Sequence, residues 1–498
     1  MKRINGLQGS GAKSILLIFL IVLLILPGLQ SKYGLIHEEA LTGAFKAPQD
    51  STLKDFTLHS WFNGSYQDEN NRYLEQHIGF RNYLIRFNNQ INFTLFKQTN
   101  AEGVIVGHNG ELFEEDYIKE YVGQYYIGDL AWLQKATQLK AVQDTLSRLG
   151  KSLVVIIEPD KASFYPELLP SKYGDLKKTV SNYDEFSKQL KVAGVNVLDL
   201  NQYFISKKGK TEFPLFAQCG THWSYYGSVL AADTTLKYLE ALRRVDLPDM
   251  RIVRNEVPDI PRHPDYDIGL ALNLIYPVPQ PETANPILGF RKGSGKTRLH
   301  ALVVGDSFYF NWFNNHIPAE TFSSCDFWYY NKNIIRSDGS KAGVTSDLDL
   351  RSEVMKRDVI MIMVTGRFMH AFAWGFDEQL YNLYYPGNLD PIEHFANQIR
   401  CYGDEFQRMY KESVNKNISL EDHIRKDAEY LYYTDLKKNP DKYTSKNDII
   451  LSYEMGIRQT PEWMKEIKRK AKVNKISVDK QIHLDAEWIY EDKYGKKK

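Results

Sequence analysis

The segment Gly305-Asp306-Ser307 carries the side chain best suited to act as a nucleophile. It follows an apolar stretch, residues 299–304, with the composition of a buried strand, and it precedes a helix-like stretch at 309–315. A serine at such a strand-to-helix turn exposes its hydroxyl at the carboxyl edge of a sheet, where backbone N–H groups can stabilise an oxyanion. Gly-Asp-Ser also occurs as a simple turn with a helix cap. In this setting the sequence predicts that Ser307 is a nucleophile.

His222 is the candidate general base. A serine hydroxyl becomes a good nucleophile when a base within hydrogen-bond reach takes its proton. His222 lies in the loop segment Thr221-His222-Trp223, before a helix-like stretch at 227–242 and in the same predicted α/β region as Ser307. The fold rather than the chain order sets their proximity, so a histidine far along the chain can serve. We therefore predict a Ser307–His222 pair.

The elements around these residues alternate between helix and strand, which predicts one α/β domain with a mainly parallel sheet between about residues 124 and 385. The helix-like stretches are 129–149 and 183–192, and the strand-like stretches are 153–157, 195–198, 299–304, 325–329 and 359–364.

Two stretches outside this alternation are informative. Apolar side chains at intervals of three and four within residues 79–96 predict a helix with one buried stripe, formed by Phe80, Leu84, Phe87, Ile91 and Leu95. The Pro-rich stretch 257–289 is long for a compact core, and such loops usually carry function or wrap a surface.

The N-terminus has the features of an export segment. Lys2, Arg3 and Lys13 precede an apolar run at 15–26, which is shorter than the roughly 20 residues that span a bilayer comfortably. It could be a signal-peptide core or a short anchor. No small-x-small cleavage motif follows, so we favour an uncleaved anchor with everything after about residue 32 outside the cytoplasm. Residues 1–31 are thus the expected signal anchor or signal peptide, and 32–60 the expected linker.

The C-terminal region, residues 390–498, contains a two-copy repeat. Asp427-Ala428-Glu429 with Tyr432 recurs as Asp485-Ala486-Glu487 with Tyr490, and each copy has the pattern of an amphipathic helix. Two copies are too few for a solenoid. We expect a small helical appendix packed on the main domain or on a partner.

Composition excludes some classes of function. A formal net charge of +1 provides no global basic field, so no nucleic-acid partner is expected. The three cysteines cannot form a disulfide framework, and no CxxC or Cys/His spacing suggests a metal site. We expect neither a metal nor a cofactor.

Several motifs together resemble the SGNH hydrolase-like alginate O-acetyltransferases, the AlgJ/AlgX-like family. Gly305-Asp306-Ser307-Phe308 resembles the first block of SGNH hydrolases, and a histidine loop ahead of the serine block resembles the permuted order of this family. The similarity covers roughly residues 55–385 and implies an SGNH-like three-layer α/β/α domain at 61–389. Other matching segments are Trp61-Phe62-Asn63-Gly64, Gly79-Phe80-Arg81, residues 106–113, Pro159-Asp160-Lys161 and Tyr165-Pro166-Glu167.

The resemblance implies an O-acetyltransferase that acts on an exported cell-surface polysaccharide. Ser307 would form an acetyl-enzyme, and His222 would take the serine proton and later activate the sugar hydroxyl. A neighbouring membrane-bound O-acyltransferase would supply the acetyl group. The catalytic domain would be anchored to the inner membrane and lie on its periplasmic side.

One departure from the family concerns the histidine loop. The family pattern is Asp-x-His-Trp, whereas this chain has Gly220 in place of the aspartate. Without a carboxylate the imidazole loses control of its tautomer and orientation, which costs orders of magnitude in rate in Ser-His-Asp systems. Another acid could reach the histidine, but the sequence does not say which one. Our default expectation is a Ser307–His222 dyad, oriented by a backbone carbonyl, and loss of activity is the competing expectation.

Five residues are auxiliary candidates. Asn331, after the strand at 325–329, is suitably placed in chain order for an oxyanion hole with the Ser307 backbone N–H. Asp306 is expected to support the serine block structurally. Candidates to line a sugar groove are Arg367, Trp374 and Trp223, with ordinary core or surface roles as the alternative.

Two further functions remain open. An SGNH carbohydrate acetylesterase would use the same serine and histidine, with water as the acceptor. A catalytically silent glycan-binding or assembly protein is suggested by Gly220 and by the C-terminal repeat.

Overall fold

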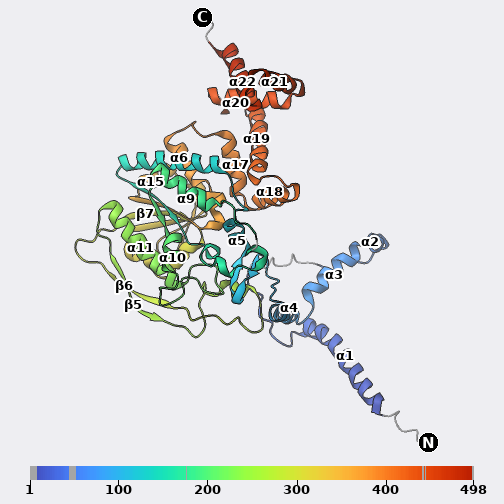
Figure 1. The fold of residues 1–498 in the computed structure, drawn as a ribbon. Coiled ribbons are helices and arrows are strands. Elements are labelled where there is room, and N and C mark those ends of the chain that lie inside the picture. Colours follow the sequence, from blue (N-terminus) through green and yellow to red (C-terminus); the bar gives the residue numbers. More distant parts are fainter. Residues whose placement is uncertain (1–7, 44–51, 175, 440–441, 444, 496–498) are drawn as a thin grey trace.

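The computed structural model describes residues 8–43, 52–174, 176–439, 442–443 and 445–495, and its centre is a seven-stranded sheet (Figure 1). The strands are β3 (Ser152–Ile157), β4 (Val197–Asp199), β7 (His300–Gly305), β8 (Ser324–Tyr329), β9 (Asn333–Ile335), β10 (Lys341–Val344) and β11 (Val359–Val364). Their order is β10-β9-β8-β7-β11-β3-β4. The pairs from β8 to β4 are parallel, and β9 and β10 add antiparallel edges. The predicted α/β fold with a mainly parallel sheet is confirmed.

The central strands are apolar throughout because both sheet faces are covered. In β3, Leu153, Val155 and Ile157 belong to one core, and Val154 and Ile156 belong to the other. The first core is formed with α6 (Asp129–Arg148), α9 (Asn182–Ala193) and α16 (Phe376–Tyr384). The second is formed with α7 (Lys161–Phe164), α10 (Leu200–Lys207) and α11 (Tyr225–Arg243). The domain is therefore a three-layer α/β/α structure.

Shorter elements complete this domain. Two hairpin-like sheets pair β1 (Val104–Val106) with β2 (Leu112–Glu114), and β5 (Asp249–Glu256) with β6 (Asn285–Arg291). The short helices are α5 (Glu115–Tyr121), α8 (Ser171–Gly174), α12 (Asp267–Ala271), α13 (Phe310–Asn314), α14 (Ile317–Thr321) and α15 (Leu350–Met355). The long loop at 257–289 thus contains α12 and runs into β6.

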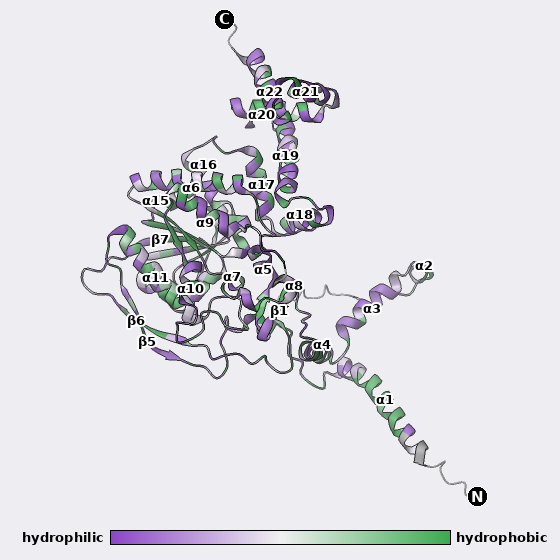
Figure 2. Cartoon of the chain, viewed as in Figure 1, coloured by the Kyte–Doolittle hydropathy of each residue, from purple (hydrophilic) through white to green (hydrophobic). Residues whose placement is uncertain are grey.

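The N-terminal part contains α1 (Gln8–Tyr33), α2 (Leu58–Phe62), α3 (Ser65–His77) and α4 (Arg81–Ile91). Within α1, residues 13–33 are long and apolar enough to cross a membrane, with a mean hydropathy of 2.5 and 6% of the most apolar window buried. Figure 2 shows α1 as a mainly hydrophobic helix that projects from the rest of the chain. The predicted basic flank at Lys2 and Arg3, and residues 44–51 of the predicted linker, lie outside the described residues.

The stripe predicted to be buried on the helix at 79–96 is wrong for most of its members. The helix is present as α4, extended by a π-helical turn at Asn92–Phe96. Leu84, Phe87, Ile91 and Leu95, however, are exposed by 52, 56, 38 and 69%. The reason is that α4 contacts the α/β/α domain through polar groups such as Asn89, whose amide donates to the Leu272 carbonyl at 2.9 Å. Apolar periodicity predicted the helix but could not identify what would cover its face.

The C-terminal region is helical, as predicted. It comprises α17 (Pro391–Cys401), α18 (Gly403–Lys416), α19 (Leu420–Lys438), α20 (Lys446–Gln459), α21 (Pro461–Asn474) and α22 (Val478–Tyr494). The repeat copies form α19 and α22, whose N-termini are capped by the side chains of Ser419 and Ser477. α17, α18 and α19 share a core that includes the buried Tyr125 of the catalytic domain, and α20 to α22 share a separate one.

A buried lysine links the segments that position the candidate site. Lys161 is 2% exposed and its Nζ lies 2.8 Å from Glu111 Oε1. The same ammonium donates to the carbonyls of Leu112, Ala217, Gln218 and Gly220 at 2.8 to 2.9 Å. Three N–H groups are thus shared among five oxygens. Lys161 therefore fixes the 217–220 loop, which directly precedes His222, against β2 and α7.

Replacing Lys161 by methionine should strongly destabilise this arrangement. The substitution leaves a buried carboxylate and several carbonyls without their donor, which costs about 3–5 kcal/mol when one partner of a buried pair is removed. Urea unfolding of the full chain in detergent measures the change. Lys191→Met, on the exposed side of α9, is the matched control and should change little. Similar stabilities for the two variants would contradict the role assigned to Lys161.

Candidate active site

Ser307 stands at the carboxyl end of β7, where the chain turns into a 3-10 turn at Ser307–Tyr309 and then α13. The Asp306 side chain stabilises this turn through hydrogen bonds. Its Oδ1 accepts from the Phe308 N–H at 3.0 Å, and its Oδ2 accepts from the N–H and hydroxyl of Thr365 at 3.1 and 2.7 Å. Because Asp306 is fully buried and bonds the end of β11, its geometry fits the expected structural role.

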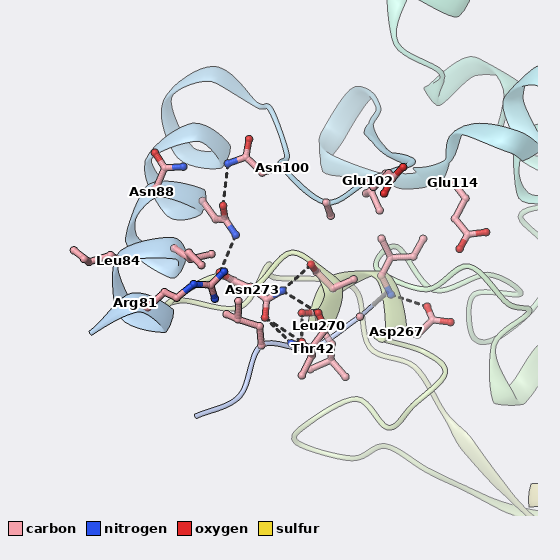
Figure 3. A pocket seen from close by; sticks show the side chains of 18 of the residues that line it. Thr42, Arg81, Leu84, Asn88, Asn100, Glu102, Glu114, Asp267, Leu270 and Asn273 are labelled. Carbon is pink, nitrogen blue, oxygen red and sulfur yellow. Dashed lines mark hydrogen bonds between the residues drawn. The ribbon is translucent and has the colours of Figure 1, made fainter. Parts of the chain in front are cut away.

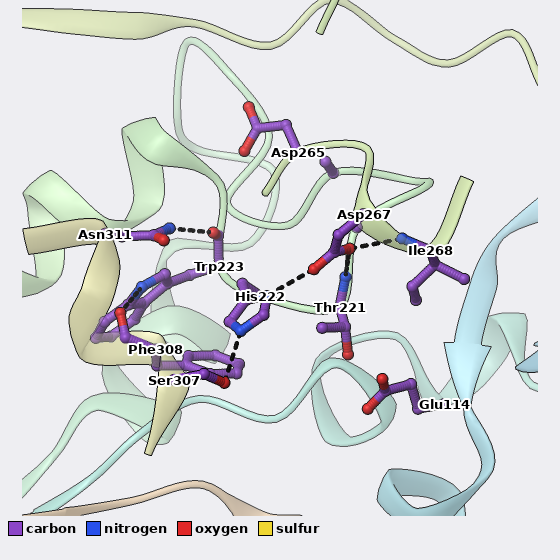
Figure 4. A network of polar contacts seen from close by, with 12 residues as sticks. Glu114, Thr221, His222, Trp223, Asp265, Asp267, Ile268, Ser307, Phe308 and Asn311 are labelled. Atoms are coloured by element: carbon purple, nitrogen blue, oxygen red, sulfur yellow. Dashed lines mark hydrogen bonds and ion pairs between the residues drawn. The ribbon is translucent and has the colours of Figure 1, made fainter. Parts of the chain in front are cut away.

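His222 lies between Ser307 and a carboxylate (Figure 4). Its Nε2 is 2.8 Å from Ser307 Oγ, and its Nδ1 is 2.7 Å from Asp267 Oδ2. The other carboxylate oxygen of Asp267 accepts from the backbone N–H groups of Thr221 and Ile268 at 2.8 and 2.7 Å. Backbone N–H groups from the histidine loop and from α12 therefore fix the Asp267 carboxylate. The three side chains form a Ser-His-Asp arrangement.

The expected dyad oriented by a backbone carbonyl is wrong, because Asp267 contacts His222 Nδ1. Asp267 is the first residue of α12, within the long loop whose length suggested a function. Nothing in the sequence distinguishes it from the other acids of that loop, Asp259, Asp265 and Glu282. The fold alone brings it to the histidine.

The loop that contains Asp267 also explains why residue 220 is a glycine. A Cβ atom added at Gly220 would lie 2.8 Å from the Pro264 carbonyl oxygen and 3.3 Å from the Asp265 carbonyl carbon. The backbone that leads to Asp267 therefore passes directly over Gly220. The family that this chain resembles has an aspartate at the position of Gly220. Here the segment that leads to Asp267 occupies the space of that side chain, and Asp267 supplies the carboxylate instead.

The electrostatics of the site favour a protonated histidine. Burial lowers the pKa of His222, but the hydrogen bond and charge of Asp267, with smaller effects of Glu114 and Asp306, outweigh it and raise the pKa above 6.5. Burial opposes ionisation of Asp267, yet its contact with His222 and its two N–H donors hold the pKa of Asp267 below the usual value. Asp267 thus stabilises the imidazolium that forms when His222 takes a proton.

A cleft of about 1200 Å³ opens on this site (Figure 3). One wall contains Glu114, His222 and Asp267. Another side is lined by residues of α3 and α4, among them Leu84 and Asn88. The cleft is therefore built between the catalytic domain and the helices that follow the N-terminal apolar segment. In the described part of the chain, no group of three or more His, Cys, Asp or Glu side chains could hold a metal ion.

The Asn331 amide donates to the Trp374 carbonyl at 3.2 Å and to Gln379 Oε1 at 3.3 Å. Its role in an oxyanion hole stays a prediction. The prediction that Trp223 lines a sugar groove is wrong. Trp223 is fully buried, and its indole N–H donates to the Phe308 carbonyl at 3.1 Å. It supports the serine turn from the core and presents no face to a sugar.

The remaining two candidates are Arg367 and Trp374. Arg367 forms an ion pair with Glu114, which lines the cleft, and lies 3.7 Å from Asp116. Trp374 packs with Tyr330 and Phe368 at ring distances of 5.0 and 5.6 Å, in a second depression that shares no lining residue with the cleft. A role for either residue in sugar binding stays a prediction.

Residues 104–282 match the family model described as "SGNH hydrolase-like domain, acetyltransferase AlgX". This part of the chain is similar to that SGNH hydrolase-like domain. The matched range includes His222 and Asp267 and ends before Ser307. The chain is also similar to two proteins named "Probable alginate O-acetylase AlgJ". It is 27% identical to that of Pseudomonas aeruginosa over 33% of this chain and 39% of the relative, and 29% identical to that of Pseudomonas putida over 28% and 35%.

These alignments span well under half the length of both relatives. Among solved structures, the O-acetyltransferase domain of Pseudomonas putida AlgJ aligns with 56% of this chain and 99% of its own, at 17% identity and a TM-score of 0.37. Pseudomonas aeruginosa AlgX aligns with 56% and 66%, at 14% identity and a TM-score of 0.39.

Replacing Asp267 by asparagine should reduce turnover of p-nitrophenyl acetate on the order of 10⁴-fold, as for the same change in Ser-His-Asp proteases. The acid side of the pH–rate profile should also move to lower pH. His222 acts as a base only when neutral, and removing the charge that raises its pKa leaves burial, which lowers it. Asp259→Asn, at an exposed position of the same loop, is the control and should behave as wild type. An unshifted profile would contradict the role of Asp267.

Replacing Gly220 by aspartate, which recreates the Asp-x-His-Trp pattern, should impair the site. The new Cβ must displace the Pro264 backbone and with it Asp267, and a displacement of about 1 Å can cost about 10²-fold in rate. Gly293→Asp, where a Cβ atom meets nothing within 4 Å, controls for the added charge. The measurement is the esterase rate of both variants. Wild-type activity in Gly220→Asp would contradict this expectation, because it would show that the Pro264–Asp267 loop can move aside.

Proposed function

We propose that this protein is an O-acetyltransferase that moves acetyl groups onto a hydroxyl of an exported polysaccharide. The carrying observation is the continuous contact from Ser307 Oγ through His222 to Asp267, at 2.8 and 2.7 Å, at the edge of an open cleft. The similarity to proteins named alginate O-acetylases supports acetyl as the group transferred and a polysaccharide as the acceptor.

The reaction runs in two acyl transfers. His222 Nε2 takes the Ser307 proton as Oγ attacks the acetyl carbonyl carbon, the bond from that carbon to the donor breaks, and the proton passes to the departing donor. In the second half, His222 takes the proton of a sugar hydroxyl, whose oxygen attacks the acetyl-Ser307 ester and releases Ser307 with its proton restored. Asp267 keeps Nδ1 protonated, so that Nε2 is the free base each time.

Partners and location follow from the same proposal. Residues 13–33 serve as an anchor in the inner membrane, and the catalytic domain lies on the exported side. The acetyl donor is a membrane-bound O-acyltransferase beside it. Gly220, in place of the family's aspartate, suggested a catalytically silent protein. This argument no longer holds, because Asp267 supplies a carboxylate to His222.

The test measures acetyl release and acetyl transfer separately with the full chain in detergent. Wild type should hydrolyse p-nitrophenyl acetate and react with a serine-directed fluorophosphonate probe, whereas Ser307→Ala should do neither and His222→Ala should lose most of both. Ser340→Ala, at an exposed turn, is the control and should match wild type. If the fluorophosphonate probe does not label the wild-type chain, the assignment of Ser307 as the nucleophile is contradicted.

An added oligosaccharide acceptor then separates the two enzyme classes. A transferase yields acetylated oligosaccharide, detected by mass spectrometry, at the expense of free acetate. An acetylesterase yields acetate alone at every acceptor concentration and would replace the proposed function.

A further inference from the structure

Helix α4 carries a partly exposed apolar stripe, of which Tyr83 also donates its hydroxyl to the His37 carbonyl at 3.3 Å. Tyr83, Phe87, Ile91 and Leu95 recur every fourth residue, so they lie along one side of the helix and its π-helical extension. Their exposed fractions are 44, 56, 38 and 69%. Large apolar side chains exposed singly are ordinary, but a continuous row of four marks an interaction surface.

The other sides of α4 are already used. Asn89 is buried and donates to the Leu272 carbonyl, which attaches the helix to the catalytic domain. Leu84, Ile85 and Asn88 line the cleft that reaches His222. The row of apolar residues is thus directed away from the attachment point, and α4 forms a thin wall with the cleft on one side.

The start of α4 is joined to the end of α1. The Gly79 N–H donates to the Pro27 carbonyl at 3.2 Å, and the Ser31 hydroxyl donates to the His77 carbonyl at 2.7 Å. The contact is so close that a Cβ at Gly79 would lie 2.3 Å from the Pro27 oxygen. Since the apolar run of α1 ends at about this point, α4 begins where the anchor leaves the bilayer.

The charge of α4 suits an anionic surface. Its sequence, RNYLIRFNNQI, contains two arginines and no acid, and Lys97 follows the π-helical turn. The Glu38 carboxylate accepts from the N–H groups of Phe80 and Asn82 at the start of the helix, so the basic charge lies mainly further along it. The Arg86 guanidinium donates to the backbone carbonyls of Glu39 and Ala40, which carry no net charge to neutralise it. An apolar row with basic flanks is the pattern of helices that lie in the interface of membranes with anionic lipids.

We propose that α4 lies on the bilayer surface, with Tyr83, Phe87, Ile91 and Leu95 inserted at the boundary between headgroups and acyl chains. This inference rests on the membrane anchoring in the proposed function. It adds that the cleft wall itself touches the lipid, so the cleft is held beside the membrane surface rather than at the end of a loose tether. A substrate or donor at the membrane can then reach Ser307 without crossing open solvent.

The test uses the full chain with Cys401 replaced by serine, reconstituted into vesicles of phosphatidylcholine and phosphatidylglycerol. An environment-sensitive fluorophore is attached at Leu20→Cys in α1, at Phe87→Cys in α4, or at Val192→Cys in α9. Val192 is 78% exposed and lies on the catalytic domain, which makes it the matched control. Two sets of lipids, with the nitroxide at a shallow or at a deep position, report contact with the bilayer by quenching; the deep set is read at Leu20, and both sets are read at Phe87 and Val192.

Quenching at Leu20 and Phe87 but not at Val192 supports the proposal. Quenching at Leu20 alone overturns it while leaving the anchor intact, and a fluorescence change at Phe87 without lipid quenching overturns it in favour of a protein partner or a second copy. Absence of quenching at Leu20 overturns the anchor and this inference with it.

A second variant guards against an effect of the label. Phe87→Glu combined with Ile91→Glu places charge on the stripe and should abolish most of the quenching of a fluorophore at Leu95→Cys, whereas Val192→Glu should leave it unchanged. Undiminished quenching in the double variant would overturn the insertion of the stripe.

Discussion

The Lys161 ammonium is the interaction on which the candidate site depends. It binds the backbone of the 217–220 loop, the end of β2 and the Glu111 carboxylate at one buried point. A buried charge requires such complete coordination, because an unsatisfied ammonium would be expensive in the interior. The requirement works in both directions: the loop supplies the carbonyls that keep Lys161 stable, and Lys161 fixes the loop that ends in His222.

From this fixed loop, the remaining geometry follows by neighbouring contacts. The Asp267 carboxylate receives N–H groups from Thr221 and Ile268, so the histidine loop and the α12 segment are joined at the carboxylate. Asp306 joins the serine turn to the end of β11 through Thr365. Ser307, His222 and Asp267 come from three separate segments, and each is held by backbone hydrogen bonds rather than by side-chain packing alone. Such preorganisation is what acyl transfer requires, since little reorganisation is left for the reaction itself.

The cleft relates this site to the N-terminal helices. One side of the cleft contains Glu114, His222 and Asp267, and another contains residues of α3 and α4. Asn89 attaches α4 to the neighbouring domain through its hydrogen bond to the Leu272 carbonyl. In the proposed arrangement, the contact of α4 with the bilayer places this side of the cleft at the lipid surface.

The sequence by itself determined the five parallel strands and singled out the serine and the histidine. Apolar runs predicted all five parallel strands because a strand covered on both faces must be apolar throughout. Ser307 was identifiable because its turn follows such a run, and His222 because the motifs around it resemble a known arrangement. The helices of the C-terminal region were likewise visible from periodicity and capping residues.

The tertiary structure alone decided which side chains meet. Asp267 has no local signal, because an acid in a long loop looks the same whether it reaches a histidine or solvent. Trp223 and Asn331 sit next to informative motifs, yet packing directs the first into the core and hydrogen bonding directs the second to Trp374. The apolar stripe of α4 shows the same limit. Periodicity reports that a helix has an apolar face, whereas contacts between segments distant in sequence decide whether protein covers it.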